Sequence, residues 1–516
     1  MGSLGFWRLA QADPDWIAAV DPDGTGYRAG DLLARVNRLA NALRAMGLRP
    51  GDGIASIQPN GVAALVTYLA AAESGLYYTP VNWHFTAAEI AYIVSDSGAG
   101  AFVADERYAA EAVKAAEEAR LPAGARLSVG AVPGFLPVAD LTAGQPATPP
   151  ADRTAGAAMH YTSGTTGRPK GVRRELSGLD PDDAGELATV LLQIFGAGPG
   201  RPNAHLVTSP NYHTAVTVFG AAALHLGHTV VYMDRWDAEQ ALALVERYRI
   251  TSTHMVPTHF KRMLALPAGV RSRYDLSSMR WLIHAAAPCP VPLKRAMLEW
   301  WGPRIYEYYA ATEGGGTLAT PQEWLERPGT VGRPWPLSEV RVVDDGGRDC
   351  PPGEPGTVYL KTGERDFAYK GDPAKTAANR IPGFFTVGDV GYLDADGFLF
   401  LCDRKADVII SGGANIYPAE IESELMAHPK VADVAVFGIP DDEWGEQVKA
   451  VVEPATGVTP GPELAAELVG SLDGRLARMK WPRSVDFIAE MPRDPSGKLL
   501  KRRLREPYWH SHGRAI

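Results

Sequence analysis

The sequence has few cysteines and little that would mark a secreted or membrane-spanning chain. Its three cysteines, Cys289, Cys350 and Cys402, lie far apart without C-x-x-C or Cys/His metal spacing, which predicts reduced thiols and no cysteine metal site. No uncharged apolar run reaches the roughly 18 residues of a transmembrane helix, and the first residues lack the charged and apolar regions of a signal peptide. We therefore expect a cytoplasmic protein without a transmembrane segment.

Basic residues are fewer than acidic ones, which gives a formal net charge of −9 at pH 7. This balance argues against a general nucleic-acid partner, although basic residues gather from Lys498 to Arg505. The rest of the composition is that of an ordinary globular protein, with 46% hydrophobic and 22% charged side chains. A chain of 516 residues predicts about two to four domains or subdomains.

Helical and strand patterns alternate along most of the chain. Apolar residues recur at helical spacing over residues 29–46 and 87–95, and short apolar runs such as 281–284 lie between helices of this kind. Strands separated by helices of this length indicate βαβ units and parallel sheets.

The pattern of the sequence changes in the C-terminal third of the chain. Short β-like runs punctuated by Gly, Pro and Asp begin near Val331, and a compact α+β unit with an expected helix over residues 464–478 follows Asp403. We expect an α/β fold class: a large N-terminal domain (residues 1–403) of two βα sheet subdomains plus a β subdomain, and a small α+β C-terminal domain (residues 404–516).

Residues Tyr161–Gly171 read YTSGTTGRPKG, a stretch rich in hydroxyls and glycine that follows a small apolar run. Free backbone amides, glycines that allow close approach and the charge of Lys170 suit an anion such as a phosphate. The pattern differs from G-x-x-x-x-G-K-[ST], because Lys170 precedes a glycine rather than Ser or Thr. On composition alone, a solvated Ser/Thr/Gly turn is an equally valid interpretation.

Seven motifs in chain order resemble the adenylate-forming superfamily, which includes acyl-CoA synthetases, nonribosomal-peptide adenylation domains and firefly luciferase. They are the loop Tyr161–Gly171, Tyr309-Ala310-Ala311-Thr312-Glu313, Val387-Gly388-Asp389, Asp403-Arg404-Lys405-Ala406-Asp407, Ser411-Gly412-Gly413, Tyr417-Pro418-Ala419-Glu420-Ile421-Glu422 and Pro495-Ser496-Gly497-Lys498. The resemblance covers nearly the whole chain and implies a mobile C-terminal domain. It also implies an ATP-dependent acid–thiol ligase, in which a carboxylate attacks the α-phosphate of ATP and coenzyme A then attacks the acyl-AMP.

The resemblance implies a set of ATP-binding residues. Asp389 would accept hydrogen bonds from the ribose hydroxyls, Arg404 would add a ribose or phosphate contact, and the ring of Tyr309 would lie against adenine. Glu313 and the neighbouring Thr312 would supply oxygen ligands to Mg²⁺. A turn role for Asp389 and a surface ion pair for Arg404 remain alternatives. The residues expected to hold the phosphates are Thr162, Ser163, Gly164, Thr165, Thr166, Gly167 and Lys170.

Lys498 is the main catalytic candidate, because the corresponding lysine of the family bridges the carboxylate and the α-phosphate during adenylation. Glu313, Thr165 and His213 are further catalytic candidates. His213 either gates the acyl site or is a core histidine with a satisfied hydrogen bond, and the sequence leaves both interpretations open.

The second half-reaction would use a different face of the C-terminal domain, which in the family rotates about a hinge. Here Ala406 occupies the hinge position, and Gly412 and Gly413 would line the tunnel for the pantetheine arm. Coenzyme A rather than a carrier protein is the expected acceptor, because no carrier domain follows Ile516. A separate carrier protein stays open.

Two positions depart from the family pattern. Ala406 stands where relatives usually have Asp or Lys, and Ala310 stands where they commonly have Gly. These departures motivate a second hypothesis, in which adenylation is delegated to another protein and this chain performs mainly the thioesterification of a supplied acyl-AMP.

Small residues in the segments that resemble the acyl pocket, including Gly315 and Gly316, predict space for a sizeable apolar acid. We expect a fatty or polycyclic acid, and hence a role such as fatty acid metabolism, rather than acetate or an amino acid. A non-catalytic nucleotide or acyl-CoA sensor, a luciferase-like oxidation and a homodimer also stay open. The expected substrate-binding residues are Tyr212, His213, His284, Ala285, Ala286, Ala310 and Gly314.

Overall fold

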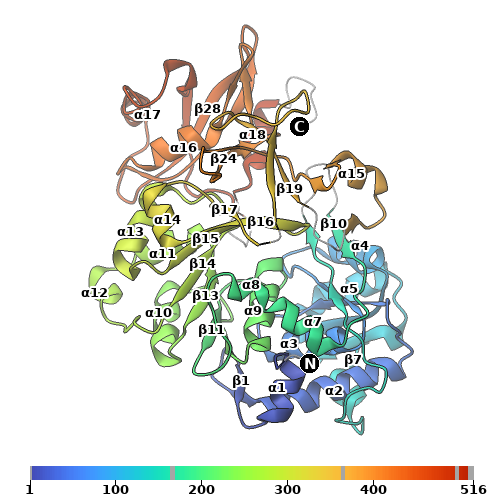
Figure 1. Cartoon of the computed structure of the whole chain (residues 1–516). Coiled ribbons are helices and arrows are strands. Elements are labelled where there is room, and N and C mark those ends of the chain that lie inside the picture. The colour runs from blue at the N-terminus through green and yellow to red at the C-terminus, as the bar shows by residue number, and fades with distance from the viewer. Residues whose placement is uncertain (1–2, 163–168, 337, 362–366, 494–498, 510–516) are drawn as a thin grey trace. The chain divides into compact units, whose positions relative to one another are not determined.

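The structure is a computed structural model that describes residues 3–162, 169–336, 338–361, 367–493 and 499–509. Figure 1 shows the course of the whole chain. The chain forms two compact units. The first comprises residues 1–255, 266–283 and 363–378, and the second comprises residues 256–265, 284–362 and 379–516. The chain therefore passes from one unit to the other more than once.

One sheet of the first unit is built from parallel strands in the order β7-β6-β5-β3-β4-β8. Helices α3 (Val62–Glu73), α4 (Ala87–Ser97) and α5 (Ala109–Glu118) connect its strands and pack against them. The strands are β3 (Gly53–Ile57), β4 (Tyr77–Pro80), β5 (Ala99–Asp105), β6 (Arg126–Val129), β7 (Leu136–Pro137) and β8 (Ala157–Ala158).

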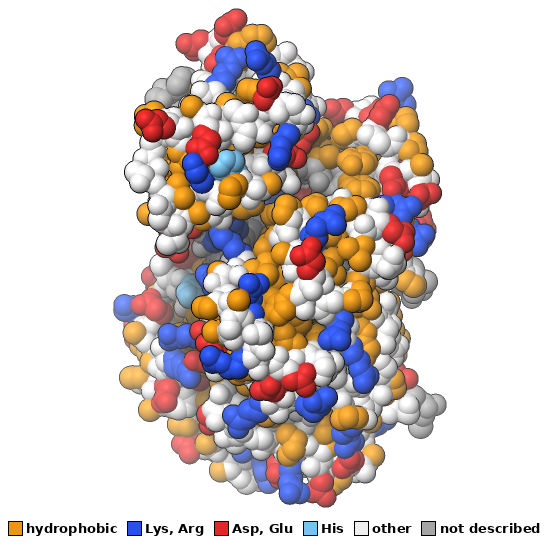
Figure 2. All heavy atoms as spheres, turned by 90° about the vertical axis from the view of Figure 1, so that its left-hand side faces the viewer, with side chains coloured by type: hydrophobic (Ala, Val, Ile, Leu, Met, Phe, Trp, Pro, Cys, Tyr) orange, Lys and Arg blue, Asp and Glu red, His pale blue; other side chains and the backbone are white. Residues whose placement is uncertain are grey.

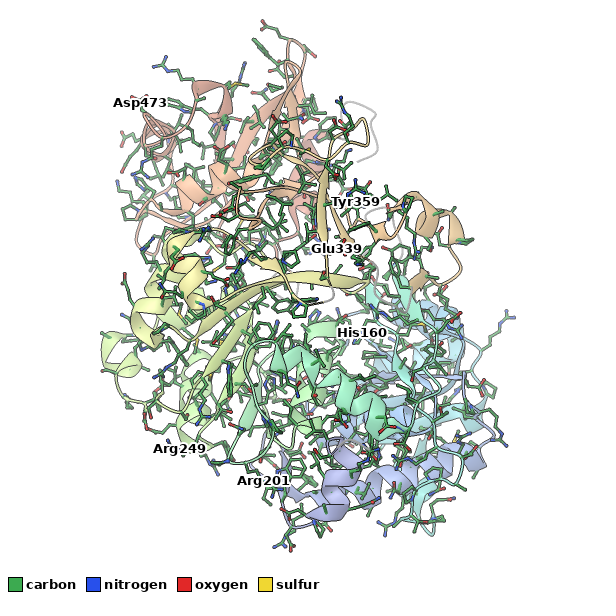
Figure 3. The ribbon with its side chains drawn as sticks, in the orientation of Figure 1. His160, Arg201, Arg249, Glu339, Tyr359 and Asp473 are labelled. Carbon is green, nitrogen blue, oxygen red and sulfur yellow. The ribbon has the colours of Figure 1, made fainter. Side chains whose placement is uncertain are left out.

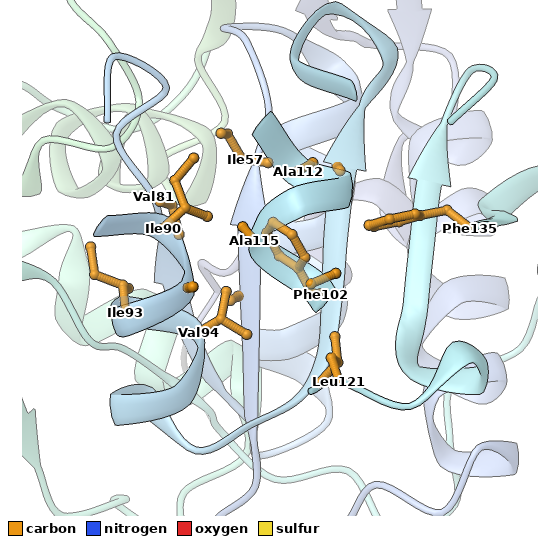
Figure 4. Close-up of a cluster of buried hydrophobic side chains, with 14 of the residues drawn as sticks. Ile57, Val81, Ile90, Ile93, Val94, Phe102, Ala112, Ala115, Leu121 and Phe135 are labelled. Atoms are coloured by element: carbon orange, nitrogen blue, oxygen red, sulfur yellow. The ribbon is translucent and has the colours of Figure 1, made fainter. Parts of the chain in front are cut away.

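Helix α4 is fixed to this sheet along one face. Ile90, Ile93 and Val94 of α4 belong to the same buried core as Phe102 of β5, and Figure 4 shows Val94 on the side of the helix that faces Phe102. A capping box between Thr86 and Glu89 starts the helix, and Gly98 ends it in the left-handed conformation at φ 67°. The helix is therefore defined both by its caps and by a buried apolar stripe.

A second sheet of the first unit has the strand order β14-β13-β11-β12-β1-β2. Strands β13, β11, β12 and β1 are parallel, and β2 closes the edge antiparallel to β1. Helices α2 (Ala29–Ala45) and α9 (Thr214–His225) pack on these strands, and α10 (Ala238–Arg247) connects β12 to β13. The strands are β1 (Ile17–Val20), β2 (Gly26–Arg28), β11 (Ala204–Val207), β12 (Thr229–Tyr232), β13 (Ser252–Met255) and β14 (Trp281–His284).

A small antiparallel sheet in the first unit surrounds strand β10 (Lys170–Arg174). It pairs with β9 (Tyr161–Thr162) on one side and with β20 (Phe367–Tyr369) on the other. Helix α15 (Pro373–Ala378) follows β20. The strand after the glycine-rich loop is therefore covered by a segment from much later in the chain.

The second unit contains an antiparallel ribbon and a β subdomain. In the ribbon, β16 (Gly314–Ala319) pairs with both β15 (Ile305–Ala311) and β17 (Arg333–Pro334). The subdomain has the order β21-β22-β19-β23-β24, with β18 paired to β19. Its strands are β18 (Val340–Val343), β19 (Gly356–Lys361), β21 (Arg380–Ile381), β22 (Phe384–Phe385), β23 (Asp389–Leu393) and β24 (Leu399–Arg404).

The C-terminal part of the second unit is a mixed sheet with helices. Its strand order is β26-β25-β28-β27, and β29 runs parallel to β28. Ile409, Ile421, Val436 and Leu468 belong to one buried core there. The elements are β25 (Ile409–Ser411), β26 (Ala414–Ile416), α16 (Pro418–Met426), β27 (Val431–Asp441), β28 (Gly445–Pro454), α17 (Pro462–Gly470), β29 (Ser484–Phe487) and α18 (Lys501–Trp509).

The α/β fold class expected from the sequence is confirmed, and one expected element is wrong. The helix expected over residues 464–478 ends at Gly470, and a turn follows in which Gly474 adopts φ 71°. The domain boundary expected at residue 404 lies inside the second unit and stays a prediction.

Two further features concern the charges on the surface and the length of the helices. Basic and acidic side chains are interspersed on the face shown in Figure 2. Among the described helices, none is long and apolar enough to cross a membrane.

Candidate active site

Two residues of the expected phosphate site lie opposite each other on neighbouring strands. Thr162 ends β9 and Lys170 begins β10, and the antiparallel register pairs them. The Lys170 Nζ lies 3.4 Å from a carboxylate oxygen of Asp372, which stands between β20 and α15. The other phosphate candidates, Ser163, Gly164, Thr165, Thr166 and Gly167, lie outside the described residues, as does Lys498, and their roles stay predictions.

Tyr212 and His213 lie at the N-terminal end of α9, among aromatic rings of the first unit. His213 is the N-cap residue of α9, and its ring centroid lies 4.5 Å from that of Tyr212. The indole of Trp83 meets Tyr212 edge-on at 4.7 Å and stacks on Tyr108 at 5.7 Å. The sequence analysis missed Trp83, because its contact with Tyr212 depends on tertiary packing and not on spacing.

Two buried histidines of the first unit interact with His213 and carry no charge at neutral pH. Burial, with the neighbouring His213 and Arg174, lowers the pKa of His160 to about 3. His160 is labelled in Figure 3 and stands immediately before β9. Burial, with His213, likewise lowers the pKa of His254 to about 3, and its ring stacks on Phe219 at 5.1 Å. The imidazoles of His160 and His254 are therefore neutral at neutral pH.

In the second unit, three predicted nucleotide-binding residues meet although they are far apart in sequence. The Tyr309 Oη donates a hydrogen bond of 2.6 Å to Asp389 Oδ2. Asp389 of β23 pairs with Arg404 of β24, and the Arg404 Nε lies 3.5 Å from Asp389 Oδ1. Burial and the adjacent Asp389 raise the pKa of Tyr309, so the phenol stays protonated and remains a donor. Asp389 is therefore held as an acceptor between a phenol and a guanidinium.

Glu313 lies in the turn between β15 and β16, directly after Thr312. Its side chain is buried, and Ala310 precedes it by three residues, on β15. A carboxylate and a hydroxyl form an oxygen donor set that fits Mg²⁺, which usually takes one or two carboxylates together with substrate phosphates. No cluster of three or more His, Cys, Asp or Glu occurs in the described part of the chain, so most ligands of such an ion would come from the nucleotide and water.

The glycines after Glu313 have a structural reason that the sequence did not reveal. Added to Gly316, a Cβ atom would lie 2.3 Å from the ring of Trp335, and at Gly315 it would lie 2.9 Å from Leu360. Gly315 also adopts φ 65° next to an irregularity in the β15–β16 pairing. The interpretation that these two glycines leave room for an acyl group is therefore wrong, because protein side chains fill the space. Gly314 remains a substrate-site prediction.

His284 ends β14 and is fully buried. Its Nε2 lies 3.5 Å from Glu307, and the Lys294 Nζ lies 2.7 Å from the same carboxylate. Burial raises the pKa of Glu307, and Lys294 opposes that shift. His284 directly precedes Ala285, which is buried, and Ala286, which is exposed at φ 75°, an unusual conformation for a residue with a Cβ.

A second buried ion cluster lies next to the expected hinge. The Lys501 Nζ of α18 is 2.9 Å from Glu422 and 3.9 Å from Asp403. Burial alone would lower the pKa of Lys501, but the two carboxylates outweigh it and raise that pKa. Asp403 Oδ2 also accepts a 3.0 Å hydrogen bond from the Ala419 amide at the start of α16. The residue before Arg404 is therefore tied to two helices.

The hinge candidate Ala406 is exposed, and its carbonyl accepts a hydrogen bond of 3.3 Å from Arg505. Polar contact at this position is thus made through the backbone, because Ala has no polar side chain to contribute.

Gly412 and Gly413 form the turn of the β25–β26 hairpin. Their φ angles of 58° and 82° are those of a tight hairpin turn, which favours glycine at both positions. A Cβ on Gly412 would also lie 2.5 Å from the ring of Trp444, whereas none of the described atoms lies within 4 Å of that position on Gly413. The hairpin explains both glycines without a ligand, and their contact with coenzyme A stays a prediction.

Comparisons with known proteins cover almost the whole chain. The family model described as AMP-binding enzyme matches residues 6–364, and the model described as AMP-binding enzyme C-terminal domain matches residues 420–498. A feruloyl-CoA synthase of Amycolatopsis is 37% identical, with 98% of this chain and 99% of the relative covered. A long-chain-fatty-acid–CoA ligase of Mycobacterium tuberculosis is 32% identical, with coverage of 98% and 99%.

Solved structures agree with these matches. The ATP-bound MatB of Rhodopseudomonas palustris aligns with a TM-score of 0.84 and 32% identity, covering 99% of this chain and 100% of MatB. The family matches include Tyr161–Gly171 and Tyr309–Glu313, whereas Asp389, Arg404 and the β25–β26 hairpin lie between the two matched ranges. The chain therefore belongs to the AMP-binding enzyme family and is an ATP-dependent acid–thiol ligase of the adenylate-forming superfamily.

Proposed function

We propose that the chain joins a sizeable apolar carboxylic acid to coenzyme A through an acyl-AMP intermediate, while ATP is converted to AMP and pyrophosphate. The observation that carries this proposal is the convergence of Tyr309, Asp389 and Arg404. A carboxylate held between two donors is a ready acceptor for the vicinal hydroxyls of a ribose.

In the first half-reaction, a carboxylate oxygen of the acid attacks the α-phosphorus of ATP. The new P–O bond forms as the bond to pyrophosphate breaks, and pyrophosphate leaves with the electron pair. Lys170 and Thr162 hold the leaving phosphates, and Asp389 holds the ribose so that the α-phosphate is oriented for in-line attack. Lys498 donates hydrogen bonds to the oxygens on which charge develops.

Glu313 would be the protein ligand of a Mg²⁺ ion in this reaction, with the hydroxyl of Thr312 as a second oxygen donor. When bound, the ion neutralises phosphate charge and polarises the reacting phosphoryl group. Glu313 sits in a short turn between two paired strands, which holds its backbone in place, and its side chain is buried.

In the second half-reaction, the sulfur of coenzyme A attacks the acyl carbonyl carbon. The bond to AMP breaks, AMP leaves, and the thiol proton is released. We propose that residues 404–516 change orientation about Ala406 between the two steps, and that Gly412 and Gly413 face the pantetheine arm in the second step.

The proposal of an apolar acid rests on the surroundings of Tyr212 and His213. The nearby rings are the indole of Trp83 and the neutral imidazoles of His160 and His254. Two relatives are named for acids with a large hydrocarbon part, one for ferulate and one for long-chain fatty acids. These two acids differ in shape, so the first panel must contain both aromatic and aliphatic members.

One observation favours a narrower function as the second candidate. Ala406 is exposed and supplies no polar side chain at the expected hinge position. If this biases the chain away from the adenylating arrangement, it acts mainly on acyl-AMP that another protein supplies.

One experiment separates the two candidates. The purified chain is incubated with Mg²⁺ and coenzyme A, and each acid is supplied either free with ATP or as synthetic acyl-AMP. Acyl-AMP and acyl-CoA are then quantified by mass spectrometry. Acyl-CoA from both routes supports the complete ligase, and acyl-CoA from acyl-AMP alone supports the narrower function. Absence of product from both routes across aromatic and aliphatic acids contradicts the proposal.

A further inference from the structure

Helix α4 makes two polar contacts with the strands that flank the glycine-rich loop. The Tyr161 Oη of β9 donates a hydrogen bond of 2.6 Å to Asp96 Oδ2. The Tyr92 Oη donates a hydrogen bond of 3.1 Å to the carbonyl of Pro169, directly before β10. Tyr92 and Asp96 are one turn apart and therefore lie on one side of the helix.

The helix can act as a fixed support, because its apolar face is part of the main core of its sheet. Ile90, Ile93 and Val94 are almost completely buried and belong to the core drawn in Figure 4, together with Ile57 of β3 and Phe102 of β5. The rings of Tyr92 and Tyr161 also pack against that core, so the two hydroxyls extend from partly buried positions.

The two hydrogen bonds are made by the residues that directly precede Thr162 and Lys170, which are expected to hold phosphate. Thr162 directly follows Tyr161, and Lys170 directly follows Pro169. The ladder pairs Lys170 with Thr162 and Gly171 with Tyr161. The position of a Cβ on Gly171 lies 3.1 Å from the Tyr161 ring, so glycine is the residue that leaves this ring undisturbed.

A third contact joins the same helix to the strand on the other side of β10. The Lys370 Nζ donates a hydrogen bond to the backbone carbonyl of Asp96. This cation lies at the C-terminal end of α4, where its charge is favourable. Residues in or directly next to the three strands β9, β10 and β20 therefore all contact one turn of α4.

We propose that Asp96 and Tyr92 are positioning residues for adenylation, which act through Tyr161 and Pro169 to hold Thr162 and Lys170 at the spacing that the ATP phosphates require. This inference rests on the proposed function. Neither residue touches the reacting atoms. Their effect is confined to the half-reaction that uses triphosphate, because acyl-AMP carries no β- or γ-phosphate.

The test measures both half-reactions of Tyr161→Phe, which removes one hydroxyl and keeps the ring. A hydrogen bond to a charged group predicts a loss of about 10-fold in kcat/KM for ATP during acyl-AMP formation. Conversion of supplied acyl-AMP to acyl-CoA should stay within about twofold of the native rate, as for a step without this contact. Calorimetric binding of a non-hydrolysable ATP analogue should weaken by the same factor of about 10 and gives a readout without turnover.

The matched control is Tyr274→Phe, which also removes a tyrosine hydroxyl from a carboxylate in the first unit. Tyr274 donates a 2.8 Å hydrogen bond to Glu239, away from β9 and β10 in the sequence. This variant should leave both half-reactions and analogue binding unchanged.

Substitutions at Asp96 provide a second test of the same contact. Asp96→Asn keeps an acceptor for Tyr161 and should retain more adenylation than Asp96→Ala. In the double variant with Tyr161→Phe, Asp96→Ala should add little further loss, because both changes remove the same contact.

Three outcomes would overturn the inference. They are native ATP kinetics and analogue binding in Tyr161→Phe, an equal loss in both half-reactions, or full additivity of the two substitutions. Failure of the proposed function looks different, because the native chain itself would then form no acyl-AMP from ATP and any acid.

Discussion

Substitution of Lys294 by Met tests whether the buried ion pair between Lys294 and Glu307 is needed for the stability of the fold. The Lys294 Nζ lies 2.7 Å from Glu307, and the lysine side chain is fully excluded from solvent. Lys294 also lies over the ring of Trp324 at 4.6 Å. Met fills a similar volume, so the main effect is to leave Glu307 buried without its counter-charge.

Breaking a buried pair in this way costs about 3 to 5 kcal/mol in the free energy of unfolding. The cost should depend on pH. Burial raises the pKa of Glu307 above its ordinary value of 4.5, and loss of Lys294 raises it further. Between the unfolded and folded pKa values, only the native state holds the proton, so stability falls as pH rises, by at most about 1.4 kcal/mol per pH unit. The deficit of Lys294→Met should therefore be larger at pH 8 than at pH 5.

Urea unfolding followed by tryptophan fluorescence at both pH values measures this effect. The double variant Lys294→Met with Glu307→Gln removes the buried charge and should recover part of the loss. Lys361→Met is the surface control, because its pair with Glu339 is exposed on both sides and should change stability by about 1 kcal/mol or less. A Lys294→Met variant as stable as the native chain at pH 8 would refute the reasoning.

Three further substitutions test individual residues. Lys498→Ala should reduce acyl-AMP formation by about 10²-fold or more while thioester formation from supplied acyl-AMP survives, and a loss below about 10-fold would contradict its role. Asp389→Asn should raise the KM for ATP by about 10-fold, because the acceptor of Tyr309 and of the ribose loses its charge, and an unchanged KM in steady-state kinetics would exclude that contact. Gly316→Ala should lower the free energy of unfolding by about 1 to 3 kcal/mol through its clash with Trp335, which thermal unfolding can detect, and an unchanged melting temperature would mean that the ring moves freely.

Local patterns were sufficient to predict many elements of the fold. The strand over residues 281–284 has the predicted bounds, and the helix expected over residues 29–46 is α2, which ends at Ala45. Each is marked by its own residues: a buried apolar run in one case, and an apolar stripe followed by Gly47 in the other. The failure at α17 has a local cause as well, because Gly470 ends the helix although apolar residues continue beyond it.

Tertiary contacts set the limit of the sequence analysis at the site. The motifs predicted that Tyr309, Asp389 and Arg404 serve one nucleotide, but no spacing predicts that Tyr309 donates directly to Asp389. Gly316 was misread for the same reason, since the ring that fills its space comes from Trp335 and contact between them depends on the fold. The contact between Asp96 and Tyr161 was likewise invisible, because neither residue belongs to a recognisable pair in the sequence.

The pairing of β10 with β20 has a consequence for synthesis of the chain. Val172 of β10 pairs with Tyr369 of β20, so this edge of β10 stays uncovered on the ribosome until most of the polypeptide has been made. An uncovered strand edge can pair with other chains. Nascent chains halted before residue 367 should therefore expose an aggregation-prone edge, and they also lack Asp372, the acidic neighbour of Lys170. A separately supplied peptide spanning β20 and α15 is the natural reagent to cap that edge.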